Sequence, residues 1–227
     1  MGARISTGAN SKQDYTTPDD FMEAVVHRFG PIAFDLAARA DNARSPNYFA
    51  PVTGPEGPLP FDPKAHGMDT FDHSWAKVSC DDRFRRNELG MHGSKGLSWL
   101  NCEFDDIPKW SSRCRNEAIL GANILLLTPA AVGSNWFIDN IAGPRAQADV
   151  YLLKGRISFI PGKPYNKDCM LSHYYSNPGD REGILRNNDC RPIRWMHVWD
   201  WKNDLILQSW ACSLDERRKI VLQSEVL

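Results

Sequence analysis

The sequence predicts an α/β protein with a mostly parallel sheet that is covered by helices on both faces. The observations behind this prediction are three short apolar runs, at residues 32–38, 97–100 and 122–129, with helical patterns along the chain between and after them. Parallel strands that are buried on both faces have continuous apolar sequences, and alternation of such strands with helices indicates this class of sheet. The chain of 227 residues is long enough for one such domain with elaborations, or at most two small domains.

Helix signals occur at several places along the chain. Thr17 is predicted to be the N-cap of the first helix, with Pro18 at its first helical position, and Gly30 ends this helix. Further helices are predicted at about 107–119 and around 134–142. Each lies next to an apolar run, so the alternation of strand and helix continues along the chain.

The remaining predicted elements are shorter. Strands are expected at 150–153 and 157–159, and residues 50–68 are expected to form a loop because they are rich in proline and glycine. Aromatic alternation at 194–201 indicates a strand or an edge hairpin. A capping-box pattern at 213–216 predicts a final helix near the end of the sequence.

Composition excludes several classes of protein. The net charge is −1 and the pI about 6.6, so an enzyme of nucleic acid with this sequence needs a local positive surface. The six cysteines form no CxxC pair and no signal peptide is visible, which together indicate reduced thiols in a cytoplasm. No apolar run reaches the roughly 20 residues that span a bilayer, so no membrane association is predicted. The six histidines show no ligand spacing, and no metal is predicted.

Four stretches of sequence together indicate a protein family, because their order and spacing are more specific than any single stretch. Together they resemble the phage-type DNA N6-adenine methyltransferase (Dam) family, over about residues 12–175. They comprise Asp14–Pro18 with Phe21, Phe34–Ala38 with Asn42, Trp99–Phe104, and a fourth group made of Leu126–Ala130, Asn135–Phe137 and Gly155–Phe159. The resemblance implies a Rossmann-like class I S-adenosylmethionine-dependent methyltransferase fold. Residues 1–13 would be a flexible arm, 14–175 the methyltransferase-like domain, and 176–227 an elaboration packed on that domain.

The resemblance also implies a cofactor site. In this family the threonine-proline segment and the acid-terminated strand hold S-adenosylmethionine, so the expected cofactor-binding residues are Tyr15, Thr17, Pro18, Asp35, Ala37 and Asp69. An acid suits the place of Asp35, because the methionyl ammonium and the ribose hydroxyls of the cofactor are hydrogen-bond donors. The alternative interpretation is that Asp35 is a strand-end acid that caps the following turn.

The partner that the resemblance implies is double-stranded DNA with an adenine flipped out of the helix. Flipping is needed because the amino group of adenine cannot be reached inside the base stack. The expected DNA-binding residues are Asn135, Trp136, Arg156, Lys163 and Lys167. Arg156 is expected to contact a phosphate or to support the active-site loop, and a structural ion pair is the alternative.

The expected catalytic residues are Asn101, Cys102, Glu103 and Phe104, where the family carries Asn-Pro-Pro-Tyr or Asn-Pro-Pro-Phe. In the family, the asparagine oxygen and the next carbonyl accept hydrogen bonds from the amino group of the adenine, and the aromatic ring stacks on the base. Asn101 and Phe104 retain the side-chain acceptor and the ring. The two prolines, which fix φ at about −65° and remove two N–H donors, are replaced.

The two replacements leave several interpretations open. Glu103 would point to solvent or to an arginine, accept a hydrogen bond from the substrate amino group, or mark a retired active site. Cys102 beside a sulfonium suggests a nucleophile, but no histidine follows within motif reach. The resemblance therefore implies a site-specific DNA adenine N6-methyltransferase, encoded by a phage to modify its DNA against restriction and acting in the host cytoplasm. The alternatives are an impaired homologue that binds DNA or cofactor without turnover, and an enzyme for a different amino acceptor.

Overall fold

A seven-stranded mixed sheet forms the centre of the computed structural model, which describes residues 16–54, 57–81, 96–142, 148–175, 196–203 and 205–209. In the order β1-β4-β5-β7-β6-β8-β9, the strands are Ile32–Asp35, Leu97–Leu100, Asn123–Pro129, Cys169–Tyr174, Ala148–Leu153, Met196–Asp200 and Leu205–Ser209. β1/β4, β4/β5 and β6/β8 pair in parallel, whereas β7 is antiparallel to β5 and β6, and β9 to β8. Five strands therefore run in one direction and two in the other, which confirms the α/β prediction at the level of a mixed, mostly parallel sheet.

Two short extended segments continue the sheet beyond β1. In residues 47–50, Phe49 donates its N–H to the carbonyl of Asp35 at 3.1 Å, and Tyr48 forms a parallel bridge with Asp35. Residues 66–69 lie on the far side of that segment, where Ala50 and Met68 form a second parallel bridge. The chain thus moves outward from β1 through both segments and returns to place β4 on the opposite side of β1. The strand order reverses between β1 and β4.

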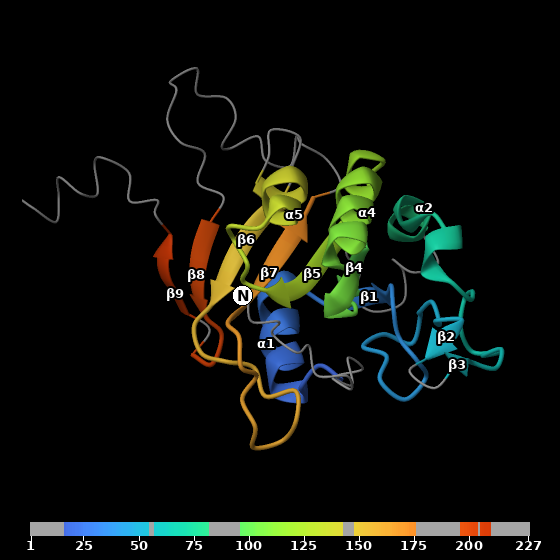
Figure 1. The fold of residues 1–227 in the computed structure, drawn as a ribbon, viewed down its shortest axis with the longest axis horizontal. Coiled ribbons are helices and arrows are strands. Elements are labelled where there is room, and N and C mark those ends of the chain that lie inside the picture. Colours follow the sequence, from blue (N-terminus) through green and yellow to red (C-terminus); the bar gives the residue numbers. More distant parts are fainter. Residues whose placement is uncertain are drawn as a thin grey trace, which may run out of the picture.

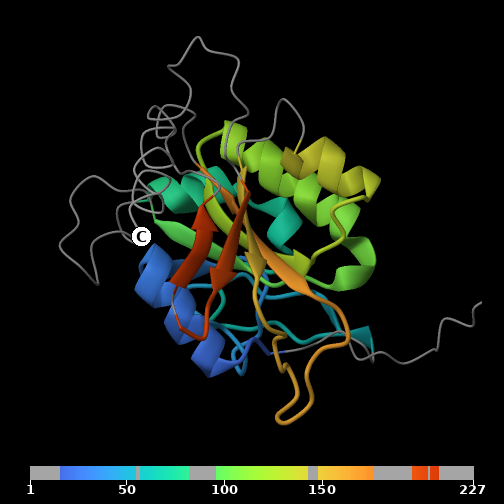
Figure 2. The same ribbon diagram turned by 90° about the vertical axis from the view of Figure 1, so that its left-hand side faces the viewer.

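Helices cover both faces of the sheet (Figures 1 and 2). Helix α1 (Asp19–Phe29) lies on one face, and α2 (Trp75–Cys80), α4 (Ile107–Ile119) and α5 (Asn135–Phe137) lie on the other. Strand β5 supplies both cores by alternation, because successive side chains of a strand point to opposite faces. Leu125 and Leu127 pack in the core under α1, while Ile124 and Leu126 pack in the core under α4 and α5.

The start of the first helix differs from the prediction. The helix begins at Asp19, and Pro18 is the N-cap, with a helix-incompatible ψ of 146°. Thr17 is therefore not the N-cap, because its hydroxyl is hydrogen-bonded to Asn101 instead. The predicted helix at 107–119 is confirmed as α4, and the helix around 134–142 is present as α5 followed by a π-helical turn, η3 (Ile138–Ala142).

Several strand predictions needed correction. The first strand ends at Asp35, in agreement with the expected acid-terminated strand, and the Asp35 carboxylate binds the N–H groups of the following turn. Residues 157–159 are not a strand but part of the long connection between β6 and β7, in which the Ile157 carbonyl accepts the N–H of Tyr165. β7 was not predicted. The loop at 50–68 contains the two-residue strands β2 (Thr53–Gly54) and β3 (Gly57–Pro58) and a short stretch of residues 66–69 that extends the main sheet.

The aromatic run near the end of the chain forms β8, one strand of a hairpin, which is one of the two predicted alternatives. β8 pairs with β9 in antiparallel register and with β6 in parallel, so this part of the C-terminal segment belongs to the main sheet. The predicted arm at 1–13 and the predicted helix from 213 lie outside the described residues. In the part of the chain that the structure describes, no helix has both the length and the apolar character to cross a bilayer.

Candidate functional site

A cleft of about 270 Å³ opens at the carboxyl ends of β1 and β4. Its walls come from residues 37–39, 49–53, 69–71 and 101–103, with Asn42 and the residues at the start of α4 closing it. These segments meet here because β1, β4 and the two extended segments beyond β1 run in the same direction and end at the same edge. In open α/β sheets, ligands bind outside the carboxyl ends of the strands where the strand order reverses. The cleft occupies that position.

The cleft collects five of the residues that the sequence singled out. Ala37, Asp69, Asn101, Cys102 and Glu103 all line it, although they come from three separate segments of the chain. Thr17 touches this group through Asn101. Tyr15 lies outside the described residues.

Asp35 lies behind the cleft wall rather than in it. Its side chain is buried, with Oδ1 accepting the N–H of Ala37 at 3.3 Å and Oδ2 the N–H of Arg44 at 2.9 Å. Burial raises the pKa of this carboxyl to about 6, although the two N–H donors and the Arg44 charge oppose that rise. This arrangement corresponds to the alternative in which Asp35 caps the turn after its strand and shapes the wall of the cleft.

Asp69 is held in a backbone conformation that few residues adopt. Its φ is +56°, the only positive value at a non-glycine residue in the described part of the chain. The carboxylate accepts the N–H of Phe71 at 3.0 Å and so caps the 3₁₀ turn η1 (Thr70–Asp72). A positive φ outside glycine costs free energy and is concentrated at ligand-binding and active sites. The strain falls on a residue of the cleft.

Aromatic rings and one cation form the wall opposite β1. The Phe71 and Trp110 rings are in contact, with centroids 4.6 Å apart, and the Lys109 ammonium lies 3.9 Å from the centroid of Phe71. Lys109 and Trp110 were not predicted as site residues. Their position in the first turn of the helix that follows the predicted catalytic motif was a usable signal, because a helix after a parallel strand starts at the ligand-binding edge.

Asn101 has a defined partner at the base of the cleft. Its Nδ2 donates to the Thr17 hydroxyl at 3.1 Å, and Thr17 is buried. The segment before α1 is thereby tied to the end of β4, 84 residues later in the chain. The structure thus brings the threonine-proline segment against the predicted catalytic motif, through a contact with Asn101.

The two replaced positions of the motif differ in exposure. Cys102 is buried, and burial, with the neighbouring charges of Glu103 and Asp106, raises the pKa of its thiol well above the ordinary range. The thiol is therefore protonated at neutral pH and is a poor nucleophile. Glu103 is exposed at the mouth of the cleft, and its backbone has φ −59° and ψ 128°.

Phe104 leaves the cleft and packs on the connection between β6 and β7. Its ring centroid is 6.3 Å from that of Phe159 and 5.9 Å from that of Tyr165, and those two rings are 5.5 Å apart. Three rings set at steep angles form an aromatic corner. This corner, defined here as Phe104, Phe159 and Tyr165, stands beside the end of β4.

The predicted DNA-binding residues fall into two groups. Arg156, Lys163 and Lys167 are exposed on the connection between β6 and β7, which projects beyond the sheet (Figure 1). Arg156 pairs with Asp168 at 3.5 Å, and because both side chains are at least half exposed this pair contributes little to stability.

The second group lies on the other helical layer. Asn135 and Trp136 line a separate depression with Pro108 and Arg115, where Arg115 donates to the carbonyl of Asp139 at 3.0 Å. The structure therefore offers two exposed surfaces that carry cations, one on the β6–β7 connection and one beside α5.

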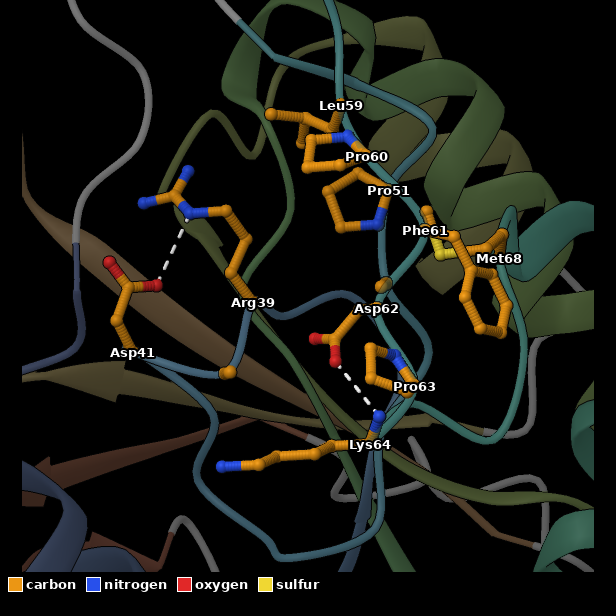
Figure 3. Close-up of a pocket in the computed structure, with 12 residues that line it drawn as sticks. Arg39, Asp41, Pro51, Leu59, Pro60, Phe61, Asp62, Pro63, Lys64 and Met68 are labelled. Carbon is orange, nitrogen blue, oxygen red and sulfur yellow. Dashed lines mark hydrogen bonds and ion pairs between the residues drawn. The ribbon is translucent and has the colours of Figure 1, made fainter.

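A larger hollow of about 450 Å³ adjoins the cleft and is shown in Figure 3. Phe61, Met68 and several prolines form its apolar wall, and it shares Arg39, Ala50 and Pro51 with the cleft. Three of its charged groups already have partners: Arg39 pairs with Asp41 at 3.2 Å, and Asp62 accepts the Tyr48 hydroxyl at 2.6 Å. None of the predicted catalytic residues line it, so the cleft is the better candidate for the functional site.

Within the described ranges, no three or more His, Cys, Asp or Glu side chains gather in a way that could hold a metal ion. Comparison of the chain with protein-family models, with curated proteins and with solved structures gave no match.

Proposed function

We propose that the chain is an S-adenosylmethionine-dependent methyltransferase that acts on the amino group of adenine in DNA. The observation that carries the proposal is the reversal of strand order between β1 and β4, which places the cleft beside Asn101–Phe104. Such a reversal occurs in open α/β sheets, Rossmann-like sheets among them, and marks their ligand site. The family resemblance of the sequence supplies the identity of the cofactor and of the acceptor.

The lining of the cleft suits S-adenosylmethionine. Ribose hydroxyls and a methionyl ammonium need acceptors, and Asp69, Glu103 and Asp106 supply carboxylates. An adenine ring and a sulfonium favour aromatic surfaces, which Phe71 and Trp110 supply. The volume of about 270 Å³ lies just below the roughly 300–1,000 Å³ of small-molecule pockets.

The catalytic work falls on the end of β4. When bound, S-adenosylmethionine supplies the methyl group. The Asn101 oxygen and the Cys102 carbonyl would accept hydrogen bonds from the adenine amino group and turn its lone pair toward that methyl group. No general base is required for this alignment, so the exposed Glu103 is free to remain in solvent at the mouth of the cleft.

The altered motif keeps a backbone that suits the family pattern. Glu103 adopts a φ of −59°, within the range that a proline ring would impose. The backbone at this position therefore keeps its conformation without the proline. What is lost is the restriction of φ that a proline ring imposes on the unfolded chain and on fluctuations of the folded one. This supports an intact acceptor geometry in the present sequence.

A second candidate function is binding without turnover, and the aromatic corner favours it. The ring expected to stack on the flipped base, Phe104, is in contact with Phe159 and Tyr165. A base can stack on Phe104 only where those rings leave its face open or move aside. If they do neither, the chain would bind cofactor or DNA without methylating it.

Nucleoside mass spectrometry of DNA incubated with the protein and isotope-labelled S-adenosylmethionine separates these candidates. We expect labelled N6-methyladenine from the native chain, and its loss with Asn101→Ala, which removes the side-chain acceptor. The double change of Cys102 and Glu103 to proline should raise the yield, since it rigidifies the acceptor carbonyl. Label in another acceptor would redirect the proposal, and no label in either protein, despite binding of cofactor, would favour the second candidate.

A further inference from the structure

Arg44 joins three segments of the chain close to the cleft. It lies in the turn after β1, where its backbone N–H donates to Asp35 Oδ2 at 2.9 Å. Its guanidinium reaches across to the segment before α1: Nη1 pairs with Asp19 Oδ1 at 2.6 Å, and Nη2 donates to the carbonyl of Thr17. One side chain thus links the turn after β1 to the start of α1.

Thr17 passes this connection on to the catalytic motif. Its carbonyl accepts from Arg44, and its hydroxyl accepts from Asn101 Nδ2 at 3.1 Å. The residue does not cap α1, because Pro18 occupies the N-cap position and its side chain makes no capping bond. Both polar ends of Thr17 are therefore used to connect Arg44 with Asn101.

We propose that Arg44 is a positioning residue that fixes the orientation of the Asn101 amide through Thr17. The inference rests on the proposed function, in which the Asn101 oxygen accepts the substrate amino group. The side-chain amide of Asn101 is planar, so the hydrogen bond from Nδ2 to the Thr17 hydroxyl also fixes the direction in which Oδ1 points. Without Arg44, the Thr17 segment loses one of its ties, and the hydrogen bond that orients the Asn101 amide is weakened.

The chemistry of the contact favours an arginine at this place. Its fork of N–H groups can engage a carboxylate and a carbonyl at the same time in fixed directions, which a lysine ammonium does less rigidly. The ion pair itself does little for stability, because the Asp19 side chain is 86% exposed while that of Arg44 is 17% exposed. The contacts of this largely buried arginine therefore serve the position of Thr17 more than the free energy of folding.

The test compares Arg44→Gln and Thr17→Val with Thr17→Ser, which keeps the hydroxyl. Lys154→Gln is the matched control, because Lys154 pairs with Asp200 at 2.8 Å on the β8 side of the sheet, away from the cleft. Two readouts are taken: the NMR signals of the Asn101 side-chain NH₂ in selectively labelled protein, and kcat and KM for methyl transfer from S-adenosylmethionine to DNA.

We expect Arg44→Gln and Thr17→Val to shift the Asn101 NH₂ signals and to lower kcat by at least about tenfold, with KM for the cofactor within about twofold. Thr17→Ser should keep both readouts near native values, and Lys154→Gln should change neither.

The two readouts separate failure of this inference from failure of the proposed function. Unchanged Asn101 signals in Arg44→Gln overturn the positioning role, whatever the activity. Shifted signals without methyl transfer in any variant, the native chain included, support the positioning role and contradict the proposed function. If Arg44→Gln does not fold, Thr17→Val decides, since native signals and native kcat in that variant would remove the link to Asn101.

Discussion

The two ends of helix α1 adjoin regions of opposite character. Toward its start the chain meets the cleft, whose walls hold a lysine and three carboxylates, one of them the strained Asp69. Along its length and at its end it packs on rings: Phe21 meets Trp201 at 5.1 Å edge-to-face, and Phe29 meets Trp199 at 5.5 Å. We refer to Phe21, Phe29, Tyr151, Trp199 and Trp201 as the ring cluster.

The difference shows where the molecule gives up stability. In the ring cluster, burial and edge-to-face contacts agree with helix and strand propensity, and even the cation Arg28 lies over the rings of Tyr151 and Trp199. In the cleft, a positive φ at Asp69 and a buried acid at Asp35 oppose folding. Local costs of this kind persist where the surrounding structure outweighs them, and they collect at functional sites.

The largest effect is expected from Phe21→Ala in the ring cluster. Phe21 is fully buried and contacts Trp99, Trp199 and Trp201, so its removal should lower the free energy of unfolding by about 3–5 kcal/mol. Val26→Ala, on the same helix but 40% exposed, is the control and should cost less than about 1 kcal/mol. Denaturant unfolding measures both, and similar losses for the two variants would contradict the contrast between cluster and surface.

A smaller effect should come from titration of Asp35. Its folded-state pKa of about 6 lies above the ordinary 3.8, so the folded protein holds this proton more tightly than the unfolded chain. The associated stability is present below pH 3.8 and is lost as the pH rises through about 6. The free energy of unfolding of the native chain, relative to Asp35→Asn, should therefore fall by up to about 3 kcal/mol between pH 4 and pH 7.

Unfolding curves of the native chain and of Asp35→Asn across that range measure this difference. A difference that stays constant with pH, or that grows as the pH rises, would show that Asp35 is not a cost to folding at neutral pH.

The smallest effect on stability is expected from Asp69→Asn. Asparagine tolerates a positive φ and keeps an acceptor for the N–H of Phe71, so the free energy of unfolding should stay within about 0.5 kcal/mol. If the carboxylate serves a ligand, affinity for S-adenosylmethionine should fall about fivefold in calorimetry. A loss of stability with unchanged affinity would assign Asp69 to the fold instead of the site.

The elements with strong local patterns could be predicted from the sequence. The strand at 97–100, the helix at 107–119 and the aromatic hairpin all have clear periodicity or end signals, and the structure confirms them. β7 was missed because its residues, Cys169–Tyr174, mix polar and apolar side chains and because antiparallel insertion between two strands is a long-range choice. Thr17 was misassigned because a capping threonine and one that bonds a distant asparagine look alike in sequence.

The residues of the candidate site also divide into those that the sequence predicted and those that it could not predict. Asn101, Glu103 and Asp69 were expected from the family resemblance of the sequence, and the structure brings them to one cleft. Arg44 could not be predicted, because its partners Thr17 and Asp19 are 27 and 25 residues away and no local pattern encodes such a contact. Asp35 was correctly expected at a strand end, but whether its carboxylate faces a ligand or a turn depends on backbone geometry beyond the strand.

The most direct test of the central claim is an NMR titration of the protein with S-adenosylmethionine. If the edge between β1 and β4 is the ligand site, the largest shifts should occur at the backbone amides of Ala37, Thr70 and Cys102, while the amide of Trp199 in the ring cluster stays unchanged. Binding that shifts the hollow around Phe61 and Lys64 instead, or no binding at millimolar cofactor, would contradict the account.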